Sequence, residues 1–192
     1  MSKKVGILFG SPRKEGNTAH LLVPFIEQLE ADGAVVTEVE LYDKEISGCM
    51  ACRTCQKDWT RFGCPIKDDM QEVFDIVLEA ELIVLATPIY SWFCTAPMKA
   101  ALDRLVYGMN KIYGEEPGPS LWEGKDLALI CTSGYRPEKA ADLLTTGMKR
   151  YCKHSKLNYR GLLGERHKSY KLPFMDDEKA EHARNFAKEL LS

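Results

Sequence analysis

Four cysteines stand close together in the first third of the chain. Cys49, Cys52, Cys55 and Cys64 are separated by two, two and eight residues, whereas three other cysteines, at positions 94, 131 and 152, stand alone. Four thiolates in one segment can ligate a four-iron cluster or a tetrahedral zinc ion. The C-x2-C-x2-C spacing favours an iron–sulfur cluster, because zinc sites more often combine two separated pairs. A redox disulfide and a segment without metal are the alternatives.

A polar segment at residues 10–16, bounded by glycines, joins the first apolar run to the first amphipathic segment. Backbone N–H groups and the helix dipole favour an anion at such a junction. Ser11, Asn17 and Thr18 add side-chain donors, and Arg13 adds a charge-assisted contact. The segment matches neither the Walker phosphate loop nor the G-x-G-x-x-G dinucleotide pattern. An anion-binding loop is therefore predicted, with a helix cap in a polar turn as the alternative.

These residues must be positioned by the apolar runs and amphipathic segments that alternate along the chain. Strands are expected at 5–9, 35–41, 82–86, 127–131 and 157–163. Helices are expected from 17 or 18 to 32, from 68 or 69 to 77, and over 95–106, 137–154 and 176–191. Residues 35–41 alternate like an edge strand, and the segment that holds the four cysteines has no period, so it is predicted to be an irregular loop.

Three local details accompany these expected helices. The first helix should bury one face, formed by Ala19, Leu22, Val23, Ile26 and Leu29. Pro24 lies inside that pattern and is expected to kink or loosen the helix. Asp69 and Glu72 have the spacing of a capping box at the start of the second helix. Asn17 or Thr18 is expected to cap the first one.

About five alternations of strand and helix, without an internal repeat or linker, are typical of an α/β protein. We expect a single domain over residues 1–192, with a doubly wound five-stranded parallel sheet between two helical layers. Ligands of such sheets bind at the carboxyl ends of the strands, where the strand order reverses. Residues 10–18, 87–95 and 131–136 should therefore form the site.

The composition is that of an ordinary soluble protein. Acidic residues number 28 and basic residues 26, and the formal net charge is −2. Such a balance predicts no binding to nucleic acid or to anionic membranes. The apolar run that begins at Val5 is too short for a secretory core or a membrane helix, so the cytoplasm is the expected location. Thiols stay reduced there, which favours metal or redox chemistry for the cysteines.

Three separated motifs resemble one known family. They are Gly10-Ser11-Pro12-Arg13 with Gly16-Asn17-Thr18, then Thr87-Pro88-Ile89-Tyr90 with Ala96-Pro97-Met98-Lys99 and Asp103-Arg104, and Gly63-Cys64-Pro65-Ile66-Lys67-Asp68-Asp69-Met70. The chain resembles, over about residues 4–135, the flavodoxin-like NAD(P)H-dependent FMN reductases, in particular their iron–sulfur flavoprotein branch. Iron–sulfur flavoproteins carry a compact four-cysteine motif in the same loop, with a last gap usually shorter than the eight residues found here.

The resemblance implies an FMN site built from three loops. Matched by position, Ser11, Arg13, Asn17 and Thr18 would hold the phosphate. The isoalloxazine ring would be lined by Pro88, Ile89, Tyr90, Ser91, Trp92 and Phe93, and closed on its other side by Thr132, Ser133 and Gly134. Three aromatic residues within four positions directly after a strand are unusual for a core, which favours a ring slot over ordinary packing.

The resemblance also implies a function, in which FMN takes hydride from NAD(P)H and passes electrons to a flavin, a quinone or a similar acceptor. No catalytic side chain is then required. One alternative is an electron carrier in which a 4Fe–4S cluster on Cys49, Cys52, Cys55 and Cys64 exchanges electrons between FMN and a ferredoxin-like partner. Another is a zinc-stabilised interaction module without enzyme activity. A homodimer or homotetramer is expected, since relatives cover their flavin partly with a neighbouring subunit.

Overall fold

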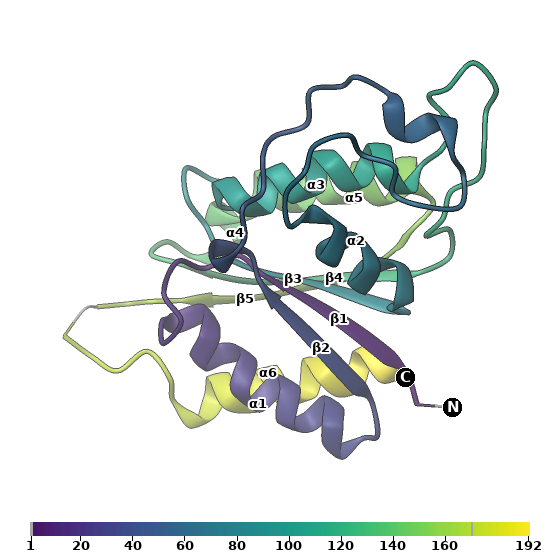
Figure 1. Cartoon of the computed structure of the whole chain (residues 1–192). Helices are drawn as coiled ribbons and strands as arrows, with labels where there is room; N and C mark the ends of the chain where they lie inside the picture. The colour runs from purple at the N-terminus through teal and green to yellow at the C-terminus, as the bar shows by residue number, and fades with distance from the viewer. Residues whose placement is uncertain (1, 170) are drawn as a thin grey trace.

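Residues 2–169 and 171–192, which the computed structural model describes, contain one five-stranded parallel sheet (Figure 1). Its strands are β1 (Lys4–Phe9), β2 (Val35–Glu40), β3 (Leu82–Pro88), β4 (Asp126–Ser133) and β5 (Asn158–Arg166), and their order is β2-β1-β3-β4-β5. This order reverses direction between β1 and β3. The predicted doubly wound sheet, with residues 35–40 at one edge, is confirmed.

Helices cover both faces of the sheet and form the outer two layers (Figure 1). On one face lie α1 (Asn17–Ala31) and α6 (Asp177–Leu191), which pack against each other. On the other face lie α2 (Met70–Glu79), α3 (Ala96–Met109), α4 (Pro137–Ala140) and α5 (Asp142–Ser155). The cysteine segment, residues 41–69 between β2 and α2, runs over the outside of this second layer as a loop (Figure 1). It contains short 3-10 turns at Leu41–Asp43 and Thr54–Lys57.

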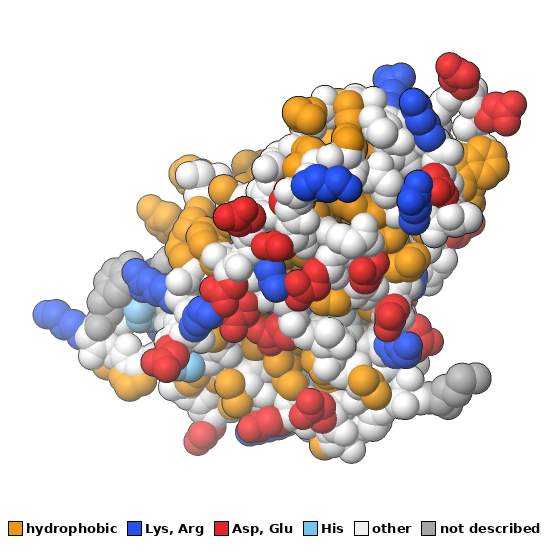
Figure 2. Space-filling view, viewed as in Figure 1, with side chains coloured by type: hydrophobic (Ala, Val, Ile, Leu, Met, Phe, Trp, Pro, Cys, Tyr) orange, Lys and Arg blue, Asp and Glu red, His pale blue; other side chains and the backbone are white. Residues whose placement is uncertain are grey.

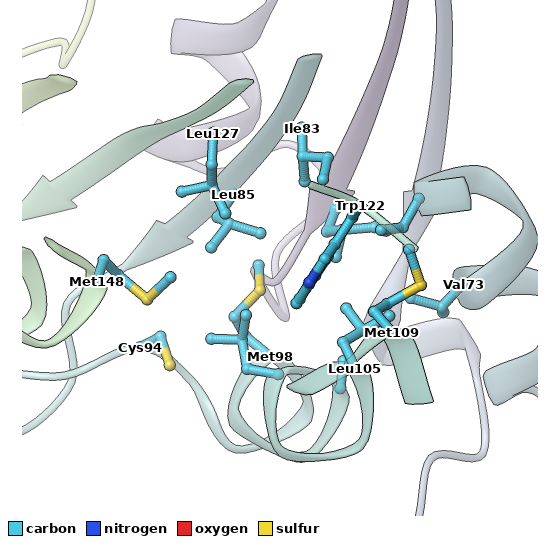
Figure 3. Packing of buried hydrophobic residues seen from close by; sticks show 14 of the residues in the cluster. Val73, Ile83, Leu85, Cys94, Met98, Leu105, Met109, Trp122, Leu127 and Met148 are labelled. Carbon is cyan, nitrogen blue, oxygen red and sulfur yellow. The ribbon is translucent and has the colours of Figure 1, made fainter. Parts of the chain in front are cut away.

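A hydrophobic core lies on each side of the sheet. Because successive strand residues point to opposite faces, Leu82 and Val84 of β3 pack toward α1 and α6, whereas Ile83 and Leu85 pack toward α2 and α3. Trp122, from the connection between α3 and β4, is 1% exposed and completes the second core (Figure 3). Each fully buried side chain of this size contributes about 1.5–3 kcal/mol. The two cores therefore fix the strand ends that carry the predicted loops.

The first helix differs from its prediction at its start and on its buried face. Its N-cap is Gly16, which has no side chain, rather than Asn17 or Thr18. The hydroxyl of Thr18 instead shares a 2.8 Å hydrogen bond with that of Thr132 on β4. Val23 is 52% exposed, so its predicted burial is wrong. The residues buried are Thr18, Leu21, Leu22, Pro24, Phe25 and Leu29, and the helix continues through Pro24 without ending there.

Two further predictions of helix detail are wrong. The helix expected over 137–154 is divided at Ala141, where φ is −109°, into the short α4 and the longer α5. The capping box at the start of α2 does not form: the Asp69 carboxylate accepts from the backbone N–H of Glu45 at 2.8 Å, and Glu72 pairs with Lys44 at 2.6 Å. Both side chains hold the incoming cysteine segment instead of the helix end.

The first described residues lie beside the C-terminal end of α6, and charged groups hold both to β4 and β5 (Figure 1). The Asp126 carboxylate accepts from Lys3 Nζ at 3.2 Å and from Arg160 Nη1 at 2.6 Å. Lys3 also donates to the carbonyl of Leu190 at 2.8 Å, and Arg160 to that of Glu189 at 3.0 Å. Burial raises the pKa of Asp126, but Lys3 and its other partners more than offset this and lower it.

The surface is mixed in charge. On the face shown in Figure 2, acidic and basic side chains are interspersed, in keeping with the formal net charge of −2. Among the described residues, no helix is both long and apolar enough to cross a membrane.

Candidate functional site

A cavity of about 400 Å³ opens at the carboxyl ends of the strands, at the point where the strand order reverses. Ten of the thirteen side chains or glycines predicted for the FMN site line it: Ser11, Arg13, Asn17, Thr18, Pro88, Ile89, Tyr90, Thr132, Ser133 and Gly134. They come from the loops after β1, β3 and β4. The structure therefore brings together segments that are more than 100 positions apart in the sequence.

One end of this cavity is suited to an anion. Gly16, Asn17 and Thr18, at the N-terminus of α1, line the cavity, so the positive end of the helix dipole lies beside it. This helix end has no side-chain cap and no acidic residue in its first turn, which leaves its N–H groups available to an anion. Ser11 Oγ accepts from the backbone N–H of Arg13 at 3.2 Å and curls the loop. A Cβ on Gly16 would lie 2.8 Å from that of Arg13, so the tight turn requires glycine.

Buried hydrogen bonds join the segments that carry the cavity lining to each other. Thr95 Oγ1 donates to the carbonyl of Gly10 at 2.7 Å, and the Thr95 N–H donates to Thr87 Oγ1 at 3.3 Å. The pair of hydroxyls on Thr18 and Thr132 links α1 to the carboxyl end of β4. These contacts join the loops after β1, β3 and β4, so the lining is preorganised before any ligand enters.

The aromatic residues after β3 form a strained turn beside the cavity. Tyr90 and Phe93 exchange two backbone hydrogen bonds of 2.9 Å, and the residues between them, Ser91 and Trp92, have φ values of 50° and 64°. Both lie in the left-handed region, which costs a non-glycine residue about 1–2 kcal/mol. Tyr90 lines the main cavity. The two strained residues line a smaller cavity of about 160 Å³ beside it.

Of the predicted ring-lining residues, Phe93 borders neither cavity and lies close to Gly147 on α5. The smaller cavity shares Ile89, Ser133 and Gly134 with the main one and is also lined by Tyr135, which is 69% exposed. Large aromatic side chains thus surround the opening while remaining accessible to water.

Sequence reasoning missed one wall of the cavity, formed by His167, Lys168 and Ser169. The His167 N–H donates to the carbonyl of Ser133 at 2.8 Å, and Arg166 Nε donates to that of Gly134 at 3.0 Å, which clamps this segment to the loop after β4. The last strand was expected to end at 163, and it ends at Arg166. Because every parallel strand ends at the same edge, the loop after this strand was the signal available.

The four clustered cysteines lie in the loop outside α2 and α3, and all are free thiols. Cys55 is buried, Cys49 and Cys64 are half-buried, and Cys52 is exposed. Within the ranges the structure describes, no three side chains of His, Cys, Asp or Glu come together as a metal site. The predicted quartet is therefore not assembled around a common point.

Two buried cations, one on α3 and one just after it, contact this segment. Arg104 of α3 is 2% exposed; it pairs with Asp68 at 2.5 Å and donates through Nη2 to Cys64 Sγ at 3.3 Å. Lys111 is fully buried and donates to the carbonyls of Cys55 at 2.9 Å and Arg61 at 2.7 Å. Burial lowers the pKa of Lys111, although Cys55 opposes that shift. The cysteine loop is thus built around positive charge.

The sulfur atoms of this loop also meet N–H donors. Cys49 Sγ accepts from the backbone N–H of Ala51 at 3.4 Å, and Cys55 Sγ from Gln56 Nε2 at 3.6 Å. Ala51 and Arg53 have left-handed φ values of 52° and 59°, which turns the backbone around the sulfurs. The N–H donor at Cys49 and the guanidinium at Cys64 favour thiolates there, whereas burial raises the pKa of the Cys55 thiol, which donates to the carbonyl of Tyr107 at 3.6 Å. Within the described residues, the sulfurs do not enclose a metal in this arrangement.

Sequence comparison identifies the family. Residues 3–145 match the model of the family described as NADPH-dependent FMN reductase. The chain belongs to this family. It is 34% identical over 149 residues to an iron–sulfur flavoprotein of Archaeoglobus fulgidus, a match that covers 78% of this chain and 63% of that protein. It is also 35% identical over 102 residues to an iron–sulfur flavoprotein of Methanocaldococcus jannaschii, covering 53% of this chain and 51% of the relative.

Solved structures of flavin enzymes share the fold of this FMN reductase family member. The NAD(P)H:quinone oxidoreductase of Methanothermobacter marburgensis is 22% identical, with a TM-score of 0.68 and coverage of 100% of this chain and 98% of that one. An FMN-dependent NADH-azoreductase of Bacillus anthracis, solved in complex with FMN, is 15% identical, with a TM-score of 0.68 and coverage of 98% and 97%. The predicted flavodoxin-like fold and the predicted family are confirmed.

The family match stops at residue 145, before β5 and the wall formed by residues 167–169. Loops after β1, β3 and β4 thus lie within the region characteristic of FMN reductases. The fourth wall of the cavity is contributed by a part of the chain outside it.

Proposed function

We propose that this protein is an FMN-dependent oxidoreductase that accepts hydride from NAD(P)H and reduces a flavin, a quinone or a similar acceptor. The observation that carries the proposal is the uncapped N-terminus of α1 at one end of a cavity whose other walls come from the loops after β3 and β4. A molecule that combines a dianionic phosphate with a planar ring matches both parts.

The residues that would hold FMN fall into three groups. Ser11, Arg13, Asn17 and Thr18 would bind the phosphate, Pro88, Ile89 and Tyr90 would border the ring with Ser91 and Trp92 at its rim, and Thr132, Ser133 and Gly134 would close the other side. Phe93, which borders neither cavity, would support this turn from the side of α5. FMN when bound supplies the hydride and electron chemistry. The chain's task is to orient the ring and leave one face open to NAD(P)H.

The role of the phosphate can be tested by comparing FMN with riboflavin, which lacks it. Arg13→Gln should weaken FMN binding about tenfold and leave riboflavin binding unchanged, because a charge-assisted contact is lost only with the phosphate. Lys14→Gln is the matched control, since Lys14 is the neighbouring exposed cation and pairs with Glu40 and Asp43 instead. Quenching of flavin fluorescence measures both affinities. Equal binding of FMN and riboflavin by the unaltered protein would overturn the assignment.

The reaction itself is tested by adding NADH or NADPH to the FMN-loaded protein without oxygen. Loss of the yellow flavin absorbance with either nucleotide supports the proposal. A flavin that stays oxidised with both nucleotides contradicts it.

A second candidate function is an electron carrier in which Cys49, Cys52, Cys55 and Cys64 bind a 4Fe–4S cluster that exchanges electrons with FMN and a ferredoxin-like partner. The donation of Arg104 Nη2 to Cys64 Sγ favours it, because such a contact stabilises a thiolate ligand. An absorption spectrum and iron analysis of anaerobically purified protein test it, with Cys52→Ala as the comparison. Protein without iron would dismiss the cluster, and zinc without FMN would point instead to a zinc-stabilised interaction module.

We further propose that the protein acts in the cytoplasm as a homodimer or homotetramer. Tyr90, Trp92 and Tyr135 are 47%, 53% and 69% exposed around the cavity opening, where a second copy could cover them. Light scattering of the FMN-loaded protein would measure the mass, and a monomer at micromolar concentration would contradict this part of the proposal.

A further inference from the structure

We infer that Lys168, in the cavity wall that follows β5, is a second cation for the phosphate of FMN and thereby selects phosphorylated flavins. The inference rests on the proposed FMN-dependent function and extends it to a residue beyond the matched family region, residues 3–145. Lys168 lines the main cavity together with Arg13. Among the described residues that line this cavity there is no aspartate or glutamate, so its charge is positive.

The path of the chain places this wall at the anion end of the cavity. β5 ends at the same edge of the sheet as the other strands, and the segment after it leads to α6, which packs beside α1 (Figure 1). The smaller cavity beside the aromatic turn is lined by Ser91, Trp92 and Tyr135, whereas residues 167–169 line only the main one. The wall therefore belongs with the N-terminus of α1, where the phosphate would bind.

The segment that carries Lys168 is restrained on both sides of this residue. The N–H of His167 donates to the carbonyl of Ser133 on β4 at 2.8 Å. On the other side, Ser169 Oγ accepts from the N–H of Lys171 at 3.1 Å. The backbone of Lys168 is thus held at the cavity, while its side chain is exposed and accessible to a ligand.

The ammonium of Lys168 forms no ion pair within the described part of the chain. Hydrogen bonds from Lys179 lower the pKa of the Asp176 carboxyl, and the charge of Lys168 adds to this shift. That carboxylate is already engaged at the start of α6, where both the backbone N–H and the ammonium of Lys179 donate to it. Lys168 therefore keeps its donors for a ligand in the cavity.

The positive charge at the anion end falls short of a phosphate monoester when Lys168 is left out. Such a phosphate carries about −1.5 to −2 charges at pH 7. The N-terminus of α1 supplies the equivalent of about +0.5, and Arg13 supplies one full charge. Lys168 raises the positive charge above that of the fully ionised phosphate. Riboflavin, which has no phosphate, gains nothing from this charge.

The test compares the affinities for FMN and riboflavin in variants of Lys168. Lys168→Gln should weaken FMN binding about two- to fivefold, the effect of an exposed ion pair, and leave riboflavin binding unchanged. Lys168→Glu should weaken FMN binding about tenfold or more, because it repels the phosphate, whereas Lys168→Arg should retain the affinity. The losses should be larger at low salt than at high salt. Quenching of flavin fluorescence measures each affinity.

Lys171→Gln is the matched control, because Lys171 is an exposed cation of the same segment that does not line the cavity. It should bind FMN as the unaltered protein does. Unchanged FMN affinity of Lys168→Glu would overturn the inference, as would equal losses in Lys168→Gln and Lys171→Gln.

Two further outcomes separate this inference from its neighbours. If Lys168→Gln raised the KM for NADPH but not for NADH and kept its FMN affinity, Lys168 would serve the extra phosphate of the nucleotide, and the inference would be wrong. Unaltered protein that binds FMN no more tightly than riboflavin would overturn the phosphate site as a whole. A clear preference for FMN that persists in Lys168→Glu would overturn the role of Lys168 alone.

Discussion

At the scale of single residues, burial separates the three isolated cysteines, which lie in the cores, from Cys52 at the surface. Cys94, Cys131 and Cys152 are buried among apolar side chains, and burial raises the pKa of Cys94 to about 11 and that of Cys152 to about 12. A raised thiol pKa leaves little thiolate at neutral pH, so these side chains should be chemically inert. Cys52 is exposed at the surface.

This division predicts the order of alkylation by iodoacetamide in the reduced, metal-free protein at pH 8. Cys52 should be labelled first, and Cys94, Cys131 and Cys152 should stay unlabelled until the protein unfolds. Mass spectrometry of peptides after timed quenching measures the order. Protein labelled in denaturant is the control and should react at all seven positions. Labelling of Cys131 as fast as Cys52 under native conditions would contradict the buried placement of β4.

Residue types alone predicted the chemistry of the cavity but not its full lining. Serine, arginine, asparagine and threonine after a strand indicate an anion site wherever the loop follows a sheet. Lys168 and His167 gave no such signal, because they follow a strand whose last residues, Gly164 to Arg166, are not apolar. The sequence also identified the cysteines as candidate ligands, whereas their separation depends on loop contacts with Arg104 and Lys111 that lie outside any spacing rule.

At the scale of elements, the strained turn after β3 carries a measurable cost. Ser91→Gly should stabilise the protein by about 0.5–1 kcal/mol, because glycine adopts a positive φ without the steric penalty of a Cβ. Ser91→Val should destabilise it by about 1 kcal/mol or more, because β-branched side chains are the least tolerated there. Urea unfolding gives both free energies.

The comparison for this turn is Thr146→Gly, inside the regular α5 helix, which should destabilise by about 0.3–0.5 kcal/mol, the difference between two poor helix formers. Equal stability of Ser91→Gly and Ser91→Val would show that the turn is not strained. The substitution of glycine should also loosen the aromatic residues beside the cavity, so FMN affinity is measured on the same samples.

Elements buried on both faces were the most predictable from sequence. Short, continuous apolar runs such as β1, β3 and β4 indicate strands of a parallel sheet when they alternate with amphipathic helices. Helix ends were less predictable, because side chains expected to cap a helix bond elsewhere. The Thr18 hydroxyl bonds to that of Thr132, and the Asp69 carboxylate accepts from the N–H of Glu45, and both partners come from other parts of the chain. These competing contacts depend on the tertiary structure, so local sequence patterns do not predict them.

At the scale of the whole molecule, Asp126 connects the N-terminal residues, two strands and the last helix. The pKa of its carboxyl is lowered in the folded protein, so the unfolded chain binds the proton more tightly. The stabilisation is therefore complete above the unfolded pKa of about 4, and is lost as the pH falls through the lower folded value.

Asp126→Asn should cost about 1–2 kcal/mol at pH 7, because Lys3 and Arg160 lose their common anion. The difference from the unaltered protein should shrink as the pH falls below about 4. Urea unfolding at a series of pH values measures it, with Asp75→Asn on the exposed face of α2 as the control. A difference in stability that grows toward acidic pH would contradict the assigned charge state.

The contacts of Lys3 with Leu190 and Asp126 place the two ends of the described chain together, at the amino ends of the strands. The cavity opens at the opposite, carboxyl ends. A purification tag, a fluorophore or a fused electron-donor protein attached at either end would therefore leave from the side away from this cavity. Such fusions give a direct way to immobilise the protein with its opening turned toward the solution.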